Sequence, residues 1–309
     1  MNQPVALKPT IALFTGDPAG IGPELVAKML SAPEALDHAN VILIGNRAGF
    51  EAEFETDFET DFEKMPGLSV HLWPGLAAPA FEPGVVSAAA GQFMLAALTE
   101  GTELVRSGAA QALCFAPLNK GALRAGGMHQ EDEMRWFAEL LNHHGACGEL
   151  NVLEGLWTSR VTSHVPLSQV SQLLSAEKVA LAIAMITQAL RASGKANPRI
   201  AVCGLNPHNG DNGNYGDEES RIIEPGVKLA ATSGFHANGP FPADGPFPAD
   251  TAFVRAIRKD GQGYDGVVTM YHDQGQIAMK LMGFERGVTV QGGLPIPIRS
   301  EERRVGKEC

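Results

Sequence analysis

The sequence contains no apolar stretch of the roughly 18 residues that a membrane-spanning helix needs, and its first residues show no apolar signal core. It also lacks a Lys/Arg-rich run before residue 299, and its formal net charge is −11. These absences argue against a membrane span and against a nucleic-acid surface, which needs a basic face. A small anionic substrate stays open, because a few local cations decide its affinity and the net charge does not.

Cysteine is scarce as well, and the four cysteines show no CxxC spacing. Cys114 and Cys203 lie in apolar, strand-like runs and are most simply small buried residues. This usage is typical of a protein from a reducing compartment. We therefore expect a cytoplasmic protein with no membrane partner and no nucleic-acid partner.

The length and hydrophobic content of the chain set the scale of the fold. With 309 residues, of which 44% are hydrophobic, the chain can form two domains or one large α/β domain. We expect strands at residues 10–15, 41–44, 112–115, 200–204 and 266–270. We expect helices at residues 22–30, 88–107, 133–141, 167–174, 177–192 and 219–232. This alternation predicts an α/β fold whose largely parallel sheet binds ligands beyond the carboxyl ends of its strands.

The most informative segment is YHDQG at residues 271–275, which follows the apolar run at 266–270. A histidine and a carboxylate at the end of a strand suit metal ligation or proton transfer, although such a pair is often structural. His164 and His208 have similar settings, because each follows an apolar run and has Pro or Gly within three residues. Three such histidines are the set that a three-histidine divalent-metal site needs. Their spacing does not show that they converge.

Two further turns have both a functional and a structural interpretation. Residues 15–24 (TGDPAGIGPE) join a strand to a helix, where glycines let the backbone approach a ligand and free N–H groups can hold an anion. The same turn can equally be only a tight connection. Asn119 and Lys120 follow the strand at 112–115 and could fix a substrate oxygen or phosphate, or simply begin a helix. The residues alone leave these alternatives open.

Six motifs, in this order, resemble those of the 4-hydroxythreonine-4-phosphate dehydrogenase (PdxA) family. They are GDPAGIGPE at 16–24, PLNK at 117–120, HVPL at 164–167, NPH at 206–208, GPFPADT at 245–251 and YHDQG at 271–275. The resemblance runs from about Ile11 to Ile298. It implies two α/β/α domains with a cleft between them, as in isocitrate and isopropylmalate dehydrogenases. It further implies a homodimer with an active site shared between its subunits.

The resemblance also implies cofactors and ligand residues. Family members oxidise a small phosphorylated hydroxy acid with NAD or NADP and a divalent metal, for which we consider Zn, Mg, Mn and Co. His164, His208 and His272 take the metal-ligand positions, with His272 expected from the partner subunit. Lys280 matches the family's substrate-phosphate lysine. The residues that bind the nicotinamide cofactor stay unknown.

Departures from the vitamin B6 enzymes of the family bear on the substrate. Glu133 and Met134 stand where those enzymes carry His-Thr, and Thr289 stands where they carry asparagine, so we expect all three to contact the substrate. The surrounding segments resemble the branch that acts on four-carbon sugar acids, the D-threonate and D-erythronate 4-phosphate dehydrogenases. Asp250, in the second copy of a duplicated GPFPAD segment, and Asp273 are expected to move protons or to orient a ligand histidine.

On this resemblance we expect oxidation at C3 of the sugar-acid phosphate and decarboxylation of the 3-keto acid to dihydroxyacetone phosphate. A divalent metal would act as a Lewis acid at the C3 oxygen. The alternative activity is oxidation of 4-hydroxythreonine 4-phosphate. A cis-dihydrodiol carboxylate dehydrogenase is disfavoured, because Lys280 implies a phosphate. The alternative of another class is an inactive dimer that binds metal and anion.

The resemblance places residues 1–125 and 290–309 in a first domain and residues 126–289 in a second. From Arg299 onward the chain is densely charged and lacks apolar periodicity. Family members continue instead with a Thr/Ser-rich turn, a His-Gly-Thr motif and a terminal helix. We therefore expect a gene that is truncated near Ile298 and followed by foreign sequence, with a cost in stability.

Overall fold

The computed structural model describes residues 8–32, 34–45, 65–71, 81–153, 155–239, 253–254, 256, 263–283 and 287–300. The chain divides into two compact units. The first comprises Met1–His144 and Leu294–Cys309, and the second comprises Gly145–Gly293. Residues 126–144, which we expected in the second domain, lie in the first unit. They do so because Phe137 is fully buried in the core of that unit.

The first unit is built on a parallel sheet in the order β3-β2-β1-β4-β10. Its strands are β1 (Thr10–Phe14), β2 (Asn40–Ile44), β3 (Leu68–His71), β4 (Ala112–Phe115) and β10 (Ile298–Ser300). Side chains of a strand alternate between the two faces of its sheet. Ala12 and Phe14 accordingly pack into one apolar cluster and Leu13 into another. Both faces of this sheet are therefore covered, as is usual for parallel sheets.

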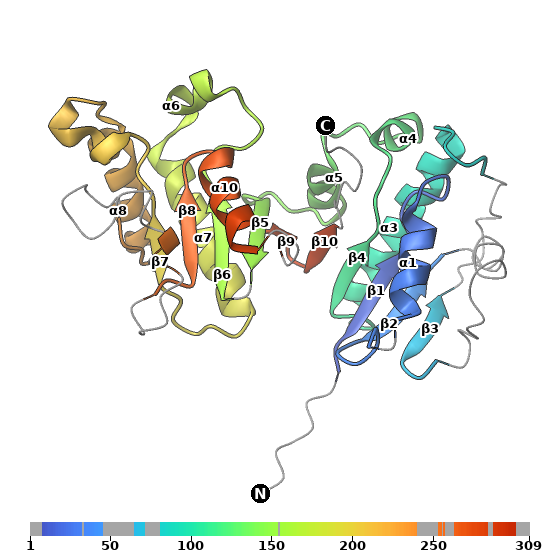
Figure 1. Cartoon of the computed structure of the whole chain (residues 1–309). Helices are drawn as coiled ribbons and strands as arrows, with labels where there is room; N and C mark the ends of the chain where they lie inside the picture. Colours follow the sequence, from blue (N-terminus) through green and yellow to red (C-terminus); the bar gives the residue numbers. More distant parts are fainter. Residues whose placement is uncertain are drawn as a thin grey trace, which may run out of the picture. The chain divides into compact units, whose positions relative to one another are not determined.

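Helices cover both faces of the first sheet (Figure 1). They are α1 (Gly22–Leu30), α3 (Ala88–Arg106), α4 (Lys120–Ala125) and α5 (Glu133–Leu140). Val26 of α1 packs against the face that carries Leu13, whereas Phe93 of α3 packs against the opposite face. Ser87 caps α3, because its Oγ accepts the backbone N–H of Ala90 at 3.1 Å.

The second unit has a mixed sheet in the order β9-β5-β6-β8-β7. Its strands are β5 (Gly148–Leu153), β6 (Leu156–Arg160), β7 (Ile200–Val202), β8 (Gly266–Thr269) and β9 (Val288–Gly292). β5 runs antiparallel to both of its neighbours, β9 and β6. β6, β8 and β7 are parallel to one another. The carboxyl ends of these three strands therefore lie at the same end of the sheet.

Helices also cover both faces of the second sheet. They are α6 (Val170–Leu173), α7 (Ala176–Ala192), α8 (Glu224–Thr232) and α10 (His272–Gly283), with the short turns η2 (Leu167–Gln169), η3 (Pro207–Gly213) and the π-helical η4 (Glu219–Ile223). Leu150 of β5 packs with Ile183 of α7, whereas Leu153 packs with Met279 of α10. Odd-numbered positions of β5 therefore face α10 and even-numbered positions face α7.

No single helix in the described part of the chain is long and apolar enough to cross a membrane. Leu167–Leu173 and α7 reach the required length and hydropathy only as a pair, with a bend of 96° between them. The apolar residues of α7, such as Val179 and Ile186, are buried in the core of the second unit.

The structure contains every strand and helix predicted above, with ends displaced by only one or two residues. The helix α10 was not predicted from the sequence. Gly275 is buried within this helix, where an added Cβ would lie 3.2 Å from Thr269 Oγ1. Arg299 and Ser300, expected to depart from the family pattern, belong to β10 and pair with Cys114 and Phe115.

Because α3 and α4 approach each other closely, we expect a methyl group added at Gly91 to have a large effect on stability. A Cβ on Gly91 would lie 1.8 Å from the carbonyl oxygen of Ala122. The overlap outweighs the gain of about 1 kcal/mol in helix propensity that alanine brings. We expect Gly91→Ala to lower the free energy of unfolding by about 1–3 kcal/mol, measured by chemical denaturation. Gln92→Ala, at an exposed neighbouring position, is the control, and equal midpoints for the two variants would contradict the packing described.

Candidate functional site

The three candidate histidines follow three neighbouring parallel strands of the second unit. His164 follows β6, His208 lies in η3 beyond β7, and His272 begins α10 after β8. β8 lies between β6 and β7 in the sheet. The topology therefore brings all three to the end of the sheet where α/β proteins bind ligands. The spacing of the histidines in the sequence could not show that they share one end of the sheet.

His164 and His272 form a pair. Their ring centroids are 5.3 Å apart, and the ring planes are tilted by 42°. Ser163 Oγ lies 3.3 Å from His164 Nδ1, and Asp273 Oδ1 lies 2.7 Å from His272 Nδ1. Each Nδ1 thus has an oxygen partner, which leaves Nε2 of each ring as the ligand atom. Metal-binding histidines usually show this arrangement, so the pair fits a divalent metal.

His208 does not join this pair. Within the described ranges, no three His, Cys, Asp or Glu side chains lie close enough together to hold a metal ion. Cys203, just beyond β7, is no substitute, because burial raises the pKa of its thiol to about 12 and the thiolate is the form that binds metals. Within one chain, the described residues therefore bring together two of the three histidines predicted as metal ligands.

The backbone that carries His208 is left-handed. φ is 52° at His208, 52° at Asn209, 82° at Gly210, 42° at Asp211 and 56° at Asn212. A left-handed conformation costs roughly 1–2 kcal/mol for each residue that is not glycine. Such a segment persists only where its surroundings hold it, and strained segments of this kind cluster at functional sites.

Glu219 holds the segment before this left-handed turn. The residue is only 4% exposed, and its Oε1 accepts the backbone N–H groups of Leu205 and Asn206, each at 2.7 Å. Its Oε2 accepts the side-chain amide of Asn206 at 3.0 Å. Gly210 packs closely against the backbone of Gly216, because a Cβ on Gly210 would lie 2.3 Å from the carbonyl oxygen of Gly216. A buried carboxylate therefore fixes the course of the chain towards His208.

A row of polar side chains lies between β5, β6 and the histidine pair. Arg160, the last residue of β6, forms an ion pair with Glu149 of β5, and its side chain is only 6% exposed. Its Nη1 donates to Asn151 Oδ1 and its Nε to Ser163 Oγ, each at 3.0 Å. Burial lowers the pKa of Arg160 below its ordinary value, and the charge of Glu149 acts in the opposite direction. The guanidinium stays charged.

Asn151 connects this row to α10 and β9. Its Oδ1 accepts a second hydrogen bond, from Gln276 Nε2 at 2.7 Å, and its Nδ2 donates to Thr289 Oγ1 at 3.1 Å. Thr289, a predicted substrate-binding residue, thus lies in the same network as His164. Arg160 and Asn151 were not predicted as site residues, because a lone arginine and a lone asparagine in strands belong to no recognisable motif.

α10 presents the remaining candidates of this unit. His272, Gln276 and Lys280 recur at intervals of four residues, so their side chains follow one face of the helix. A rise of about 1.5 Å per residue places Lys280 about 12 Å beyond His272 along the axis. The helix packs beside β6 and β8 (Figure 1). One helical face therefore joins a candidate metal ligand to the candidate phosphate lysine.

The remaining predicted site residues that the structure describes lie outside the second unit's polar network. Glu133 is buried at the start of α5 in the first unit, and its Oε2 lies 3.7 Å from Lys120 Nζ. Met134 follows it and is half-buried. Asn119 caps α4 by accepting a backbone N–H at 3.1 Å, which is the structural interpretation of that turn. Asp250 lies outside the described residues.

The glycine-rich turn after β1 has a structural explanation. Gly16 has a φ of 82°, and a Cβ there would lie 2.5 Å from the carbonyl oxygen of Pro117. A Cβ on Gly22 would lie 2.0 Å from the carbonyl oxygen of Thr15. Both glycines are therefore required by close backbone packing, whether or not an anion binds at this turn.

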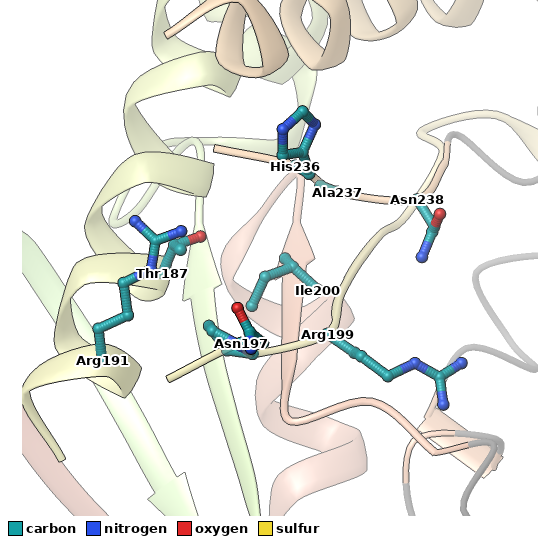
Figure 2. A pocket seen from close by; sticks show the side chains of 9 residues that line it. Thr187, Arg191, Asn197, Arg199, Ile200, His236, Ala237 and Asn238 are labelled. Atoms are coloured by element: carbon teal, nitrogen blue, oxygen red, sulfur yellow. The ribbon is translucent and has the colours of Figure 1, made fainter. Parts of the chain in front are cut away.

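A cavity of about 310 Å³ lies at the other end of the second sheet. Figure 2 shows Thr187 and Arg191 of α7 on one side of it and residues 236–238 on the other. Ile200, the first residue of β7, also lines it. The cavity therefore lies at the amino end of this strand, and it contains none of the predicted site residues. We place the candidate site at the histidine end.

Comparison with known proteins identifies the family. The family model described as "Pyridoxal phosphate biosynthetic protein PdxA" matches residues 37–303. The chain belongs to this family. A PdxA relative from Pseudomonas aeruginosa, provisionally named 4-hydroxythreonine-4-phosphate dehydrogenase 2, is 48% identical over 96% of this chain and 89% of its own length. The D-threonate 4-phosphate dehydrogenase of Salmonella typhimurium is 37% identical over 93% of this chain and 88% of its own.

Solved structures agree with this assignment. The crystal structure of 4-hydroxythreonine-4-phosphate dehydrogenase from Klebsiella pneumoniae superposes with a TM-score of 0.84 at 32% identity, over 96% of this chain and 91% of that one. These comparisons confirm the predicted α/β fold class and the prediction that this PdxA protein is a dehydrogenase. The match to the family model continues past Ile298, where we expected the resemblance to end.

The role of Glu219 can be tested by removing its carboxylate. We expect Glu219→Ala to lower the free energy of unfolding by about 2–4 kcal/mol, because two backbone N–H groups lose a charged acceptor. Hydrogen exchange at Leu205 and Asn206 should accelerate with it. Glu224→Ala, which removes an exposed carboxylate 3.9 Å from Lys228, is the control. Unchanged exchange at the two amides would show that Glu219 does not hold this loop.

Proposed function

We propose that this PdxA-family protein converts D-threonate 4-phosphate or D-erythronate 4-phosphate into dihydroxyacetone phosphate and carbon dioxide with NAD or NADP. The observation that carries the proposal is the face of α10, where His272 pairs with His164 at one end and Lys280 lies further along. A short substrate with hydroxyl groups near one end and a phosphate at the other matches this order. The 37% identity to a D-threonate 4-phosphate dehydrogenase supports the same substrate class.

The proposed conversion is balanced in atoms and electrons. The C3 carbinol loses a hydride, which converts NAD(P) into NAD(P)H, and its hydroxyl group loses a proton. The 3-keto acid then loses carbon dioxide as its C1–C2 bond breaks, and C2 takes up a proton. When bound, a divalent metal would supply a Lewis acid at the C3 oxygen, and the nicotinamide would supply the hydride acceptor.

The chain's own residues have distinct parts in this proposal. His164 and His272 would hold the metal, and Asp273 fixes the orientation of the His272 ring through the 2.7 Å contact to Nδ1. Lys280 binds the phosphate as a point cation. Thr289 contacts the substrate from β9.

Three further residues complete the proposal from the family resemblance. Asp250 moves a proton, and Glu133 and Met134 line the substrate site. Glu133 is a buried carboxylate whose Oε2 lies 3.7 Å from Lys120 Nζ.

4-Hydroxythreonine 4-phosphate is the second candidate substrate, because the 48% identical relative carries the name of that activity. Both compounds have a carboxylate at C1, a hydroxyl at C3 and a phosphate at C4. They differ at C2, which carries a hydroxyl in the sugar acid and an ammonium group in the amino acid. An enzyme can therefore distinguish the two substrates by the polar group at C2.

A substrate panel tests the proposed function. We expect NADH or NADPH to form with D-threonate or D-erythronate 4-phosphate in the presence of a divalent metal, with dihydroxyacetone phosphate as product, and we expect chelation to abolish it. Turnover of 4-hydroxythreonine 4-phosphate alone would refute the sugar-acid proposal. Bound metal without turnover of any of these compounds would instead support an inactive metal-binding protein.

The pair of His164 and His272 within one chain leads us to propose a different partner ligand from the one that the family resemblance implied. The family resemblance implied His272, yet His272 lies beside His164 in the same chain. We propose a homodimer in which His208 of the partner subunit completes the three-histidine site. His208 is exposed on a fixed, left-handed turn, as a ligand offered to another subunit must be.

Metal content and subunit mixing test this arrangement. His164→Ala and His272→Ala should each lose bound metal, whereas His236→Ala, at the opposite end of the sheet, should retain it. Mixed dimers of His164→Ala with His208→Ala should regain metal and about a quarter of wild-type activity, because half of the dimers are mixed and each has one intact site. Mixed dimers of His164→Ala with His272→Ala should stay inactive. The reverse pattern would show that His272 is the partner's ligand.

A further inference from the structure

Arg160 fixes the direction of each hydrogen bond in the polar row beside α10. A guanidinium only donates hydrogen bonds, so the Asn151 atom 3.0 Å from Nη1 is its carbonyl oxygen. The amide nitrogen of Asn151 must then face Thr289. Gln276 must present its own nitrogen to the same carbonyl oxygen, at 2.7 Å. The orientations of both amides therefore follow from one buried cation.

This orientation leaves two polar groups for a ligand. With its nitrogen turned to Asn151, Gln276 retains Oε1, an acceptor that has no partner among the described residues. Thr289 Oγ1 receives the Asn151 N–H and keeps its own hydrogen and one lone pair. Both side chains are half-buried, so a ligand can reach them. Together they offer one acceptor and one donor.

We propose that Gln276 and Thr289 form a subsite for an uncharged hydroxyl group of the substrate, and that Asn151 and Arg160 are its positioning residues. A hydroxyl group can donate to Gln276 Oε1 and accept from Thr289 at the same time. This proposal rests on the proposed function, and it assigns the subsite to the C2 hydroxyl of the sugar acid. An ammonium group only donates, and it would leave the Thr289 hydrogen without an acceptor.

The charges around the subsite also favour a hydroxyl group over an ammonium group. Arg160 and Glu149 beside it form an ion pair, so together they add no net charge. Lys280, one turn of α10 beyond Gln276, adds a positive charge. Recognition of an ammonium group normally uses an unpaired carboxylate. The subsite therefore discriminates between the two candidate substrates at the one carbon where they differ.

A nearly isosteric substitution tests the proposal. Asn151→Asp keeps acceptors for Arg160 and Gln276, but it obliges Thr289 to turn its hydrogen inward and adds a negative charge. Both changes favour an ammonium group over a hydroxyl. We expect kcat/KM for D-threonate 4-phosphate, divided by kcat/KM for 4-hydroxythreonine 4-phosphate, to fall about 10-fold or more. Measured on one preparation, this ratio does not depend on the fraction of protein that is folded.

A second variant and a control complete the experiment. Gln276→Glu changes a half-buried position on a helix and should lower the same ratio. Ser159→Ala removes a side-chain hydrogen bond of β6 on the α7 side, where Ser159 Oγ lies 3.3 Å from the Ala182 carbonyl oxygen, and should leave the ratio unchanged.

The outcomes separate the two proposals. If the wild-type enzyme turns over the sugar-acid phosphate and both variants show the wild-type ratio of the two kcat/KM values, the hydroxyl subsite alone is overturned. A wild-type enzyme that turns over no sugar-acid phosphate would overturn the proposed function and, with it, the assignment of the subsite. A ratio that falls in both variants, but not in Ser159→Ala, would support the subsite.

Discussion

A buried arginine must have its charge paired and its donors occupied, and this requirement organises the second unit. Arg160 meets it with Glu149, Asn151 and Ser163. Removal of one partner from a buried pair typically costs about 3–5 kcal/mol, because the remaining charge stays buried and unpaired. One cation therefore binds the strand β5 and the turn before the histidine pair to the end of β6. A change in any of these segments alters the contacts of the others.

The consequence for function is that Arg160 influences the orientation of both histidines, through hydrogen bonds and through the helix α10. Ser163 carries the influence of Arg160 to His164, and Asn151 carries it to Gln276 on α10. The same helix begins at His272. Two separate routes thus lead from one guanidinium to the two sides of the histidine pair. Preorganised polar groups of this kind need no rearrangement when a charged substrate arrives.

The fold was predictable from the sequence wherever a parallel strand is buried on both faces, because such strands are continuous apolar runs; the run at 266–270 is an example. The same rule placed the three histidines at strand ends. β5 was not predictable, because it carries Glu149 and Asn151 on the face towards α10 and so interrupts the apolar pattern. α10 was hidden for a related reason, since His272, Gln276 and Lys280 give it a polar face at its most informative positions. In both cases the residues that concealed the element are those that make up the site.

His208 depends on a different anchor from that of the other two histidines. Glu219 holds its loop through backbone N–H groups, and no hydrogen bond joins Glu219 to the Arg160 network among the described residues. A left-handed turn is costly, and strained segments of this kind cluster at functional sites. A ligand that must enter another subunit's site gains affinity when it is already fixed, because less conformational freedom is lost on association. Separate anchoring of His208 is therefore consistent with the proposed site divided between two subunits.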